Sequence, residues 1–379
     1  MDHDELAGWL RLLLTPRLGP AACRALLATF GSPQAVFQAS PAALSACVKP
    51  ADATRVRACP PQLALAVELT QAWLGESTPA SPRCILTLGD AAYPADLLAL
   101  ADPPLLLFAQ GDVSLLQGRR VAMVGSRSPT AQGRDNAQAF AMALSQAGVT
   151  VVSGLAQGID GAAHEGALAD GAGRTVAVVG TGLDRVYPKE HLDLAHRIAQ
   201  HGLLLSEFPL GTPPRPGHFP KRNRLVAALS RATLVVEAAL QSGSLITARV
   251  AAELGREVLA IPGSIHSPQA RGCHALIKQG AKLVETAQDV LEELDWGIPT
   301  AAATSPDEGQ SLDWSGDADT DASVDPVLRA MGYDPVSQDA LSARTGMGPA
   351  DLGVRLLELE LLGQVARLPG ALYQRIGLT

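Results

Sequence analysis

A cluster of basic side chains stands out in a chain of 379 residues whose formal net charge is −8. The segment FPKRNRLVAALSRATLVVEA contains Lys221, Arg222, Arg224 and Arg231, and residues 208–236 include no Asp or Glu. Guanidinium and ammonium groups pair with phosphates, so the chemistry that such a cluster offers is anion binding. A solvated basic surface is the alternative, but it would not require acids to be absent over so long a segment.

The net charge hides an uneven distribution of acidic residues. Of the 38 Asp and Glu, 12 lie in residues 283–328, where Lys and Arg are absent. The rest of the chain carries 30 basic side chains against 26 acidic ones, a balance of +4. The acidic composition therefore does not exclude a nucleic acid as ligand.

Small and polar residues follow the strands that we predict in the middle of the chain. Runs such as RVAMV, TVVS, TVAVV, LLLS, ATLVV, EVLA and AKLV alternate with Ala-rich helical stretches, which predicts a doubly wound parallel sheet. Ligands of such sheets bind beyond the carboxyl ends of the strands, where loops entering helices direct N–H groups at anions. Candidate phosphate contacts at these ends are Gly125, Ser126, Arg127, Ser242, Gly243 and Ser244.

Each of these candidates also has a structural interpretation. Arg127 suits a phosphate, but a salt bridge to a neighbouring carboxylate is the alternative. Ser242 or Ser244 can cap the helix that follows, which is compatible with a phosphate site there. Two acids, Glu207 and Glu237, end neighbouring strands and could form a carboxylate pair, although acid–base catalysis is not favoured.

Other motifs of catalysis or nucleotide binding are missing. GSRSPTAQG does not match a GxGxxG fingerprint, and the chain has no GxxxxGK[ST] loop. His164 has no accompanying Ser or Cys nucleophile motif, so a packed histidine is expected. The five cysteines are scattered without CxxC spacing, which predicts reduced thiols in a cytoplasmic protein and no metal site. No apolar run is long enough to span a membrane.

The flanking regions differ from the central one. The pattern of residues 1–80 predicts a helical domain, in which Gly31 ends one helix and Ser32-Pro33 begins the next. Within it, PRLGP could be the turn of a helix-hairpin-helix element, or the whole region could be a small helical packing domain. Residues 296–323 are rich in Pro, Gly, Ser and Asp and predict an acidic disordered linker. Residues 324–379 predict a winged-helix domain whose acidic second helix suits a protein contact better than a DNA groove.

The central region, 81–295, contains a series of motifs in a fixed order over about residues 84–290. They are VAMVGSR, VVSGLAQGIDGAAHEGAL, GTGLDRVYPKEH, LLLSEFPLG, FPKRNRLVAALS and VVEAALQSGSLITARVAAELGREVLAIPG. In these motifs and their order the region resembles the DNA-processing protein A (DprA/Smf) family. The resemblance implies an extended Rossmann-like sheet and a non-enzymatic protein without cofactor, metal or catalytic residues. It further implies a homodimer that binds single-stranded DNA and loads the RecA recombinase during natural transformation.

Carried onto this chain, the resemblance assigns DNA binding to twelve positions. They are Gly125, Ser126, Arg127, Lys189, Lys221, Arg222, Asn223, Arg224, Ser242, Gly243, Ser244 and Thr247. Only 4% of residues are aromatic, so binding through the DNA backbone is expected. Phe219 is the aromatic placed to touch a base, and a place in the core is the alternative for it. The alternative is an enzyme of the nucleoside-monophosphate phosphoribohydrolase type, although EAALQSGSLITA lacks the PGGxGTxxE loop of those proteins.

Overall fold

The structure is a computed structural model, and its chain forms two compact units. Unit 1 comprises Met1–Gln117 and Val176–Leu229, and unit 2 comprises Gly118–Thr175 and Ser230–Thr379. The structure describes residues 1–169, 171–296, 325–332, 335–368 and 370–375. The predicted linker at 296–323 therefore lies, apart from Trp296, outside the described residues.

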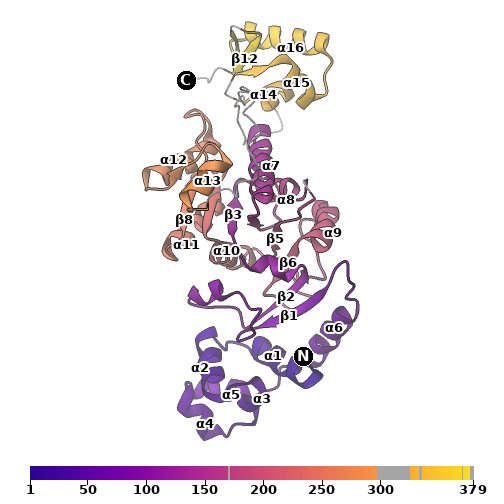
Figure 1. The fold of residues 1–379 in the computed structure, drawn as a ribbon, viewed down its shortest axis with the longest axis vertical. Coiled ribbons are helices and arrows are strands. Elements are labelled where there is room, and N and C mark those ends of the chain that lie inside the picture. Colours follow the sequence, from indigo (N-terminus) through magenta and orange to yellow (C-terminus); the bar gives the residue numbers. More distant parts are fainter. Residues whose placement is uncertain (170, 297–324, 333–334, 369, 376–379) are drawn as a thin grey trace. The chain divides into compact units, whose positions relative to one another are not determined.

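Unit 1 begins with short helices whose starts follow directly from the sequence (Figure 1). Ser32 and Ser40 accept hydrogen bonds from Ala35 N and Ala43 N, and each is followed by a proline at the first helical position. Gly31 ends the preceding helix with a φ of +79°, as predicted. The helices are α1 His3–Leu14, α2 Pro20–Phe30, α3 Pro33–Gln38, α4 Pro41–Cys47, α5 Pro50–Arg57 and α6 Leu63–Gly75.

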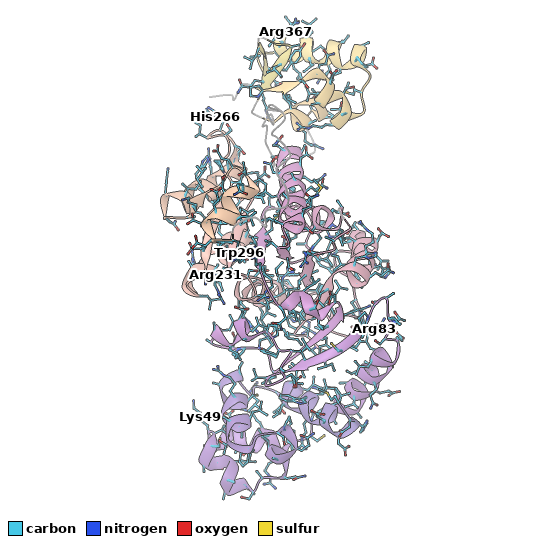
Figure 2. All side chains as sticks on the ribbon, viewed as in Figure 1. Lys49, Arg83, Arg231, His266, Trp296 and Arg367 are labelled. Atoms are coloured by element: carbon cyan, nitrogen blue, oxygen red, sulfur yellow. The ribbon has the colours of Figure 1, made fainter. Side chains whose placement is uncertain are left out.

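The strands of unit 1 run in the order β1-β2-β6-β5. Strand β6 is parallel to β5 and antiparallel to β2, which is itself antiparallel to β1. Arg83 at the start of β1 donates to Trp73 O at 2.9 Å and to Glu76 Oε2 at 2.6 Å, which ties the strand to the end of α6 (Figure 2). The elements are β1 Arg83–Thr87, η1 Ala95–Ala99, β2 Leu106–Gly111, η2 Val113–Leu116, β5 Thr175–Val178, η3 Lys189–His191, α9 Leu192–His201, β6 Leu203–Ser206 and α10 His218–Ala228.

Unit 2 holds parallel strands in the order β4-β3-β7-β8-β9. Helices connect them in sequence, as the alternation of strand and helix patterns predicts. The elements are β3 Arg120–Val124, α7 Ala131–Gln146, β4 Thr150–Ser153, α8 Ile159–Ala169, β7 Ala232–Val235, α11 Gly243–Glu253, β8 Glu257–Ala260, η4 Pro268–Ala270, α12 Arg271–Lys278, β9 Lys282–Leu283 and α13 Ala287–Glu293.

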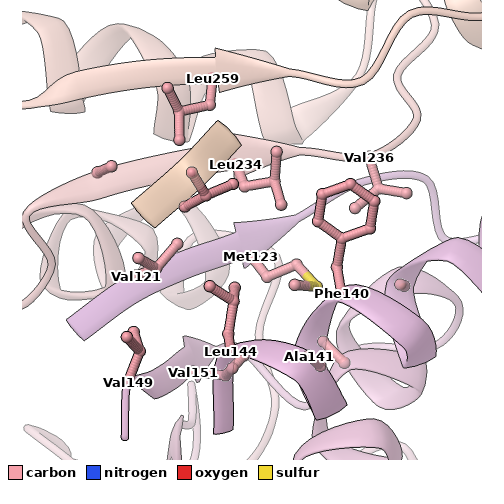
Figure 3. Close-up of a cluster of buried hydrophobic side chains, with 14 of the residues drawn as sticks. Val121, Met123, Phe140, Ala141, Leu144, Val149, Val151, Leu234, Val236 and Leu259 are labelled. Carbon is pink, nitrogen blue, oxygen red and sulfur yellow. The ribbon is translucent and has the colours of Figure 1, made fainter. Parts of the chain in front are cut away.

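The core of unit 2 lies between these strands and helix α7 (Figure 3). Val121 and Met123 on β3 and Leu234 on β7 are fully buried, and Phe140 and Leu144 on α7 pack in the same cluster. Burying aliphatic side chains of this size contributes about 1.5–3 kcal/mol each, so this cluster fixes the strand ends that carry the candidate site.

The last part of the chain forms a winged helix, as predicted. Its small sheet has the order β10-β12-β11, and its own core includes Leu341, Leu356 and Tyr373. Arg355 on α16 pairs with Glu358 Oε2 at 2.5 Å, so the one basic residue of this helix is already engaged by an acid. The elements are α14 Pro326–Met331, β10 Val336–Ser337, α15 Gln338–Thr345, α16 Pro349–Leu361, β11 Val365–Leu368 and β12 Leu372–Arg375.

The observed architecture confirms the predicted fold class, a mostly parallel α/β sheet flanked by helical and winged-helix parts. The free thiols of Cys23 and Cys273 are buried, which raises the pKa of each to about 12. None of the helices in the described ranges has the length and apolar character to cross a membrane.

Candidate nucleic-acid interface

The loop after β3 contains Gly125, Ser126 and Arg127. Ser126 N donates to Glu237 O at 2.8 Å, and Ile159 N donates to Ser126 O at 3.1 Å. A Cβ on Gly125 would lie 2.6 Å from Ile159 Cγ1 and 2.9 Å from Glu237 O, so only glycine allows this close approach. The loop is thereby fixed, and the side chain of Arg127 is exposed to solvent.

Glu237, at the end of β7, builds the start of helix α7. Its carboxylate accepts from Thr130 N at 3.0 Å and from Thr130 Oγ1 at 2.5 Å. Thr130 is the N-cap of α7 and accepts from Gly133 N at 2.8 Å. The carboxylate therefore organises the helix start, which is a structural role.

The second set in unit 2 surrounds the first turn of α11. Ser242 is the N-cap, and its Oγ accepts from Ser244 N at 3.3 Å and lies 2.6 Å from Ser244 Oγ. Gly243 is exposed, whereas Ser244 and Thr247 are buried. The expected capping is confirmed, and a phosphate contact at this turn stays a prediction.

Lys221 lies near the start of α10 in unit 1 and is about half exposed, at 49%. Its ammonium nitrogen lies 3.4 Å from Glu207 Oε2 and 5.2 Å from the centroid of the Phe208 ring. That ring in turn stacks on His218, with 4.3 Å between centroids. A carboxylate and an aromatic face therefore hold the ammonium in place while part of it faces solvent.

Arg224 points into the protein and binds two acids. Its Nη2 donates to Glu207 Oε2 at 2.5 Å, and its Nε lies 3.3 Å from Asp102 Oδ2. The side chains of Arg224 and Glu207 are only 12% and 6% exposed. Burial raises the pKa of Glu207, and the charges of Arg224 and Lys221 act in the opposite direction.

Arg222 is 3% exposed and is the most buried member of the basic cluster. Its Nη1 donates to Val178 O on β5, and its Nε donates to Asn223 Oδ1 at 3.0 Å. Arg222 and Arg224 therefore both have internal partners in this structure, and a DNA contact by either of them stays a prediction. Within α10, Lys221 is the cation of this cluster that remains accessible.

A second accessible lysine, Lys189, begins the short helix η3 after β5. Two residues before it, Tyr187 is 49% exposed, and its ring centroid lies 5.6 Å from that of Phe219 at an interplanar angle of 39°. Tyr187 is not among the positions predicted from the sequence. The signal that could have identified it is a large aromatic residue in a polar loop at a strand end.

His164, which was expected to be packed, is fully buried, and its Nδ1 lies 2.7 Å from Thr175 Oγ1.

The structure separates the twelve predicted positions by unit and by accessibility. The exposed cations among the predicted positions are Arg127 in unit 2 and Lys189 and Lys221 in unit 1. Arg231, also exposed, precedes β7 at the amino end of the strand, away from the end where ligands of such sheets bind (Figure 2).

Three family matches cover most of the chain. Residues 84–295 match DNA recombination-mediator protein A, residues 315–371 match the DprA winged helix domain, and residues 3–67 match the DprA-like N-terminal HHH domain. Together they correspond to the Rossmann-like, winged-helix and helical parts described above.

Curated relatives give the same result. Protein Smf of Escherichia coli is 44% identical over 286 residues, which are 75% of this chain and 75% of that protein. DNA processing protein DprA of Bacillus subtilis is 45% identical over 210 residues, 55% of this chain and 70% of that protein.

Two solved structures are also similar. DNA processing protein A of Streptococcus pneumoniae matches with a TM-score of 0.63 and 37% identity, covering 77% of this chain and 98% of that one. The Helicobacter pylori protein, whose structure was described for its single-stranded DNA binding mode, matches with a TM-score of 0.51 and 33% identity, covering 55% and 95%. The chain described here therefore belongs to the DNA recombination-mediator protein A family.

Proposed function

We propose that this protein binds single-stranded DNA and delivers the strand to a RecA-type recombinase during natural transformation, as a homodimer and without catalysis of its own. The observation that carries the proposal is the position of three exposed cations, Arg127, Lys189 and Lys221, in segments that follow β3, β5 and β6. In a recombination-mediator family with a relative described for single-stranded DNA binding, phosphates are the anions that these cations suit.

The chemistry of this binding is mainly electrostatic. Lys189 and Lys221 are compact charges that can follow a flexible backbone, and Arg127 offers a planar fork to one phosphate. The loop at Gly125 keeps the peptide N–H groups near Arg127 in a fixed arrangement. Binding of this kind is weakly selective for sequence. It weakens as the salt concentration rises, because the counterions that the protein displaces from the DNA are then released into a more concentrated salt solution.

The first test compares single- and double-stranded oligonucleotides by fluorescence anisotropy over a salt series. We expect preference for the single strand and a linear fall of log K with log salt concentration. The variants Arg127→Gln, Lys189→Gln and Lys221→Gln should each weaken binding and reduce the slope by about 0.7, the value for one phosphate contact on a single strand.

Arg231→Gln is the matched control for these variants. Arg231 is exposed and close in sequence to Lys221, but it lies at the amino end of β7, so its replacement should leave the slope unchanged. Unchanged affinity in all three test variants, or equal loss in Arg231→Gln, would contradict the proposed contacts.

The second test addresses recombinase delivery. Single-stranded DNA coated with a single-strand binding protein delays recombinase assembly, and the delay can be followed by DNA-dependent ATP hydrolysis. We expect this protein to shorten the delay, and the double variant Arg127→Gln/Lys221→Gln to lose the effect. A delay that is the same with and without the protein would overturn the delivery role while leaving DNA binding intact.

A further inference from the structure

Two aromatic rings of unit 1 form a supported pair after β5. Tyr187 and Phe219 lie 5.6 Å apart between centroids, tilted by 39°, although 31 residues separate them in the chain. Phe219 is the less exposed of the two, whereas half of Tyr187 is open to solvent. The pair therefore has an inner and an outer ring.

The inner ring lies against the backbone of the loop that follows β5. A Cβ on Gly180 would lie 3.3 Å from Phe219 Cδ1, so the absence of a side chain at Gly180 gives the ring its place. His218, the residue before Phe219, has its Nδ1 3.1 Å from Gly180 O, which fixes the start of α10 at the same point. The order from the inside outward is the Gly180 backbone, then Phe219, then Tyr187.

Cations flank this pair at short range along the chain. Lys189 and Lys221 are each exposed and each lie two residues after one of the rings, a separation of at most about 7 Å along the backbone. Single-stranded nucleic acids are bound by this combination of aromatic faces for bases and cations for phosphates. The other tyrosines that the structure describes, Tyr93 and Tyr373, are buried.

We propose that Tyr187, backed by Phe219, stacks on one base of the bound strand, with Lys189 at the adjoining phosphate. This inference rests on the proposed function and adds to it a contact with a base. Stacking requires a π-face but no particular hydrogen-bonding edge, so the contact tolerates any base. The contact is expected to strengthen binding of a strand that carries bases but not of a strand that consists only of the sugar-phosphate backbone.

The experiment uses the full-length protein and two labelled oligomers with equal numbers of phosphates. One is an oligothymidylate and the other is abasic throughout. Wild-type protein should bind the oligothymidylate more tightly. Tyr187→Ala should weaken that complex about 5- to 150-fold, corresponding to the loss of one stacked base, while affinity for the abasic oligomer and the salt slope stay unchanged.

Three further variants sharpen the comparison. Tyr187→Phe keeps the ring and should bind like the wild type. Tyr187→Leu keeps an apolar contact with Phe219 but has no π-face, so it should behave like Tyr187→Ala even if the alanine variant is less stable. Leu65→Ala, which removes a side chain 59% exposed on α6, is the control for loss of exposed apolar surface and should have no effect.

The outcomes distinguish the two proposals. If Tyr187→Ala and Tyr187→Leu bind the oligothymidylate as the wild type does, or lose affinity for both oligomers equally, the stacking role is wrong, although DNA binding stands. If the wild type binds neither oligomer, the proposed function itself is wrong. If Lys189→Gln lowers the salt slope with both oligomers while Tyr187→Ala affects only one, both proposals are supported.

Discussion

Replacement of Glu207 by alanine is expected to lower the free energy of unfolding by about 3 kcal/mol. Glu207 is buried and binds Arg224, itself only 12% exposed, and it also contacts Lys221. Removing the carboxylate leaves the buried Arg224 guanidinium without its closest acceptor and with the more exposed Asp102 as its remaining acid, and breaking a buried ion pair is among the most destabilising changes in a protein. Urea unfolding followed by circular dichroism measures the change.

Two variants frame this prediction. Glu207→Gln keeps an oxygen for Arg224 and should cost less than alanine. Glu190→Ala removes an exposed acid from η3 in the same unit and should change stability by no more than about 0.5 kcal/mol. A Glu207→Ala protein as stable as the Glu190→Ala protein would show that the buried ion pair does not support the fold.

Arg222→Ala is the second replacement with a large expected effect, a decrease of about 3 kcal/mol in the free energy of unfolding. The Arg222 side chain fills buried space, and its guanidinium binds Val178 O at the end of β5. Truncation leaves a cavity and removes the donor from a buried carbonyl, and each of these changes destabilises. Thermal unfolding of the variant should therefore begin at lower temperature than that of the wild type.

Lys221→Ala is the adjacent comparison, because Lys221 is exposed where Arg222 is buried. We expect Lys221→Ala to weaken DNA binding with little change in stability, and Arg222→Ala to do the reverse at temperatures where it is folded. A stable Arg222→Ala protein that no longer binds DNA would instead make Arg222 a direct contact and overturn the conclusion drawn from its burial.

The central fold could be predicted because its strands are short β-branched runs between Ala-rich helices. Strands β3 to β9 follow that pattern, and the structure confirms them. The winged helix was predicted from short helical segments followed by the pair QVARL and ALYQR, and the structure confirms it as well. Strands β1 and β2 were missed. RCILT and LLFAQG contain few β-branched residues and show no alternation. In addition, β2 pairs with β6, which is remote in sequence, and β1 joins the sheet only through β2.

The candidate site was harder to predict, because the number of basic residues in a segment does not reveal which of them bind acids elsewhere in the protein. The acid-free segment begins at residue 208, one residue after Glu207, and the second acid on Arg224 is Asp102, far away along the chain. Arg222 did carry a readable signal. It stands three residues before Leu225 and four before Val226, at the spacing of one buried helix face, so the apolar pattern of α10 places it inside.

The arrangement of Lys221 between a carboxylate and an aromatic ring has an entropic consequence. A lysine on an open surface samples many rotamers, and immobilising such a side chain at an interface costs about 0.5–1.5 kcal/mol. Here Glu207 and Phe208 already restrict the chain in the free protein. The entropy cost of ordering the Lys221 side chain therefore arises largely when the protein folds. A DNA strand that binds at this lysine meets a charge that is already held in position.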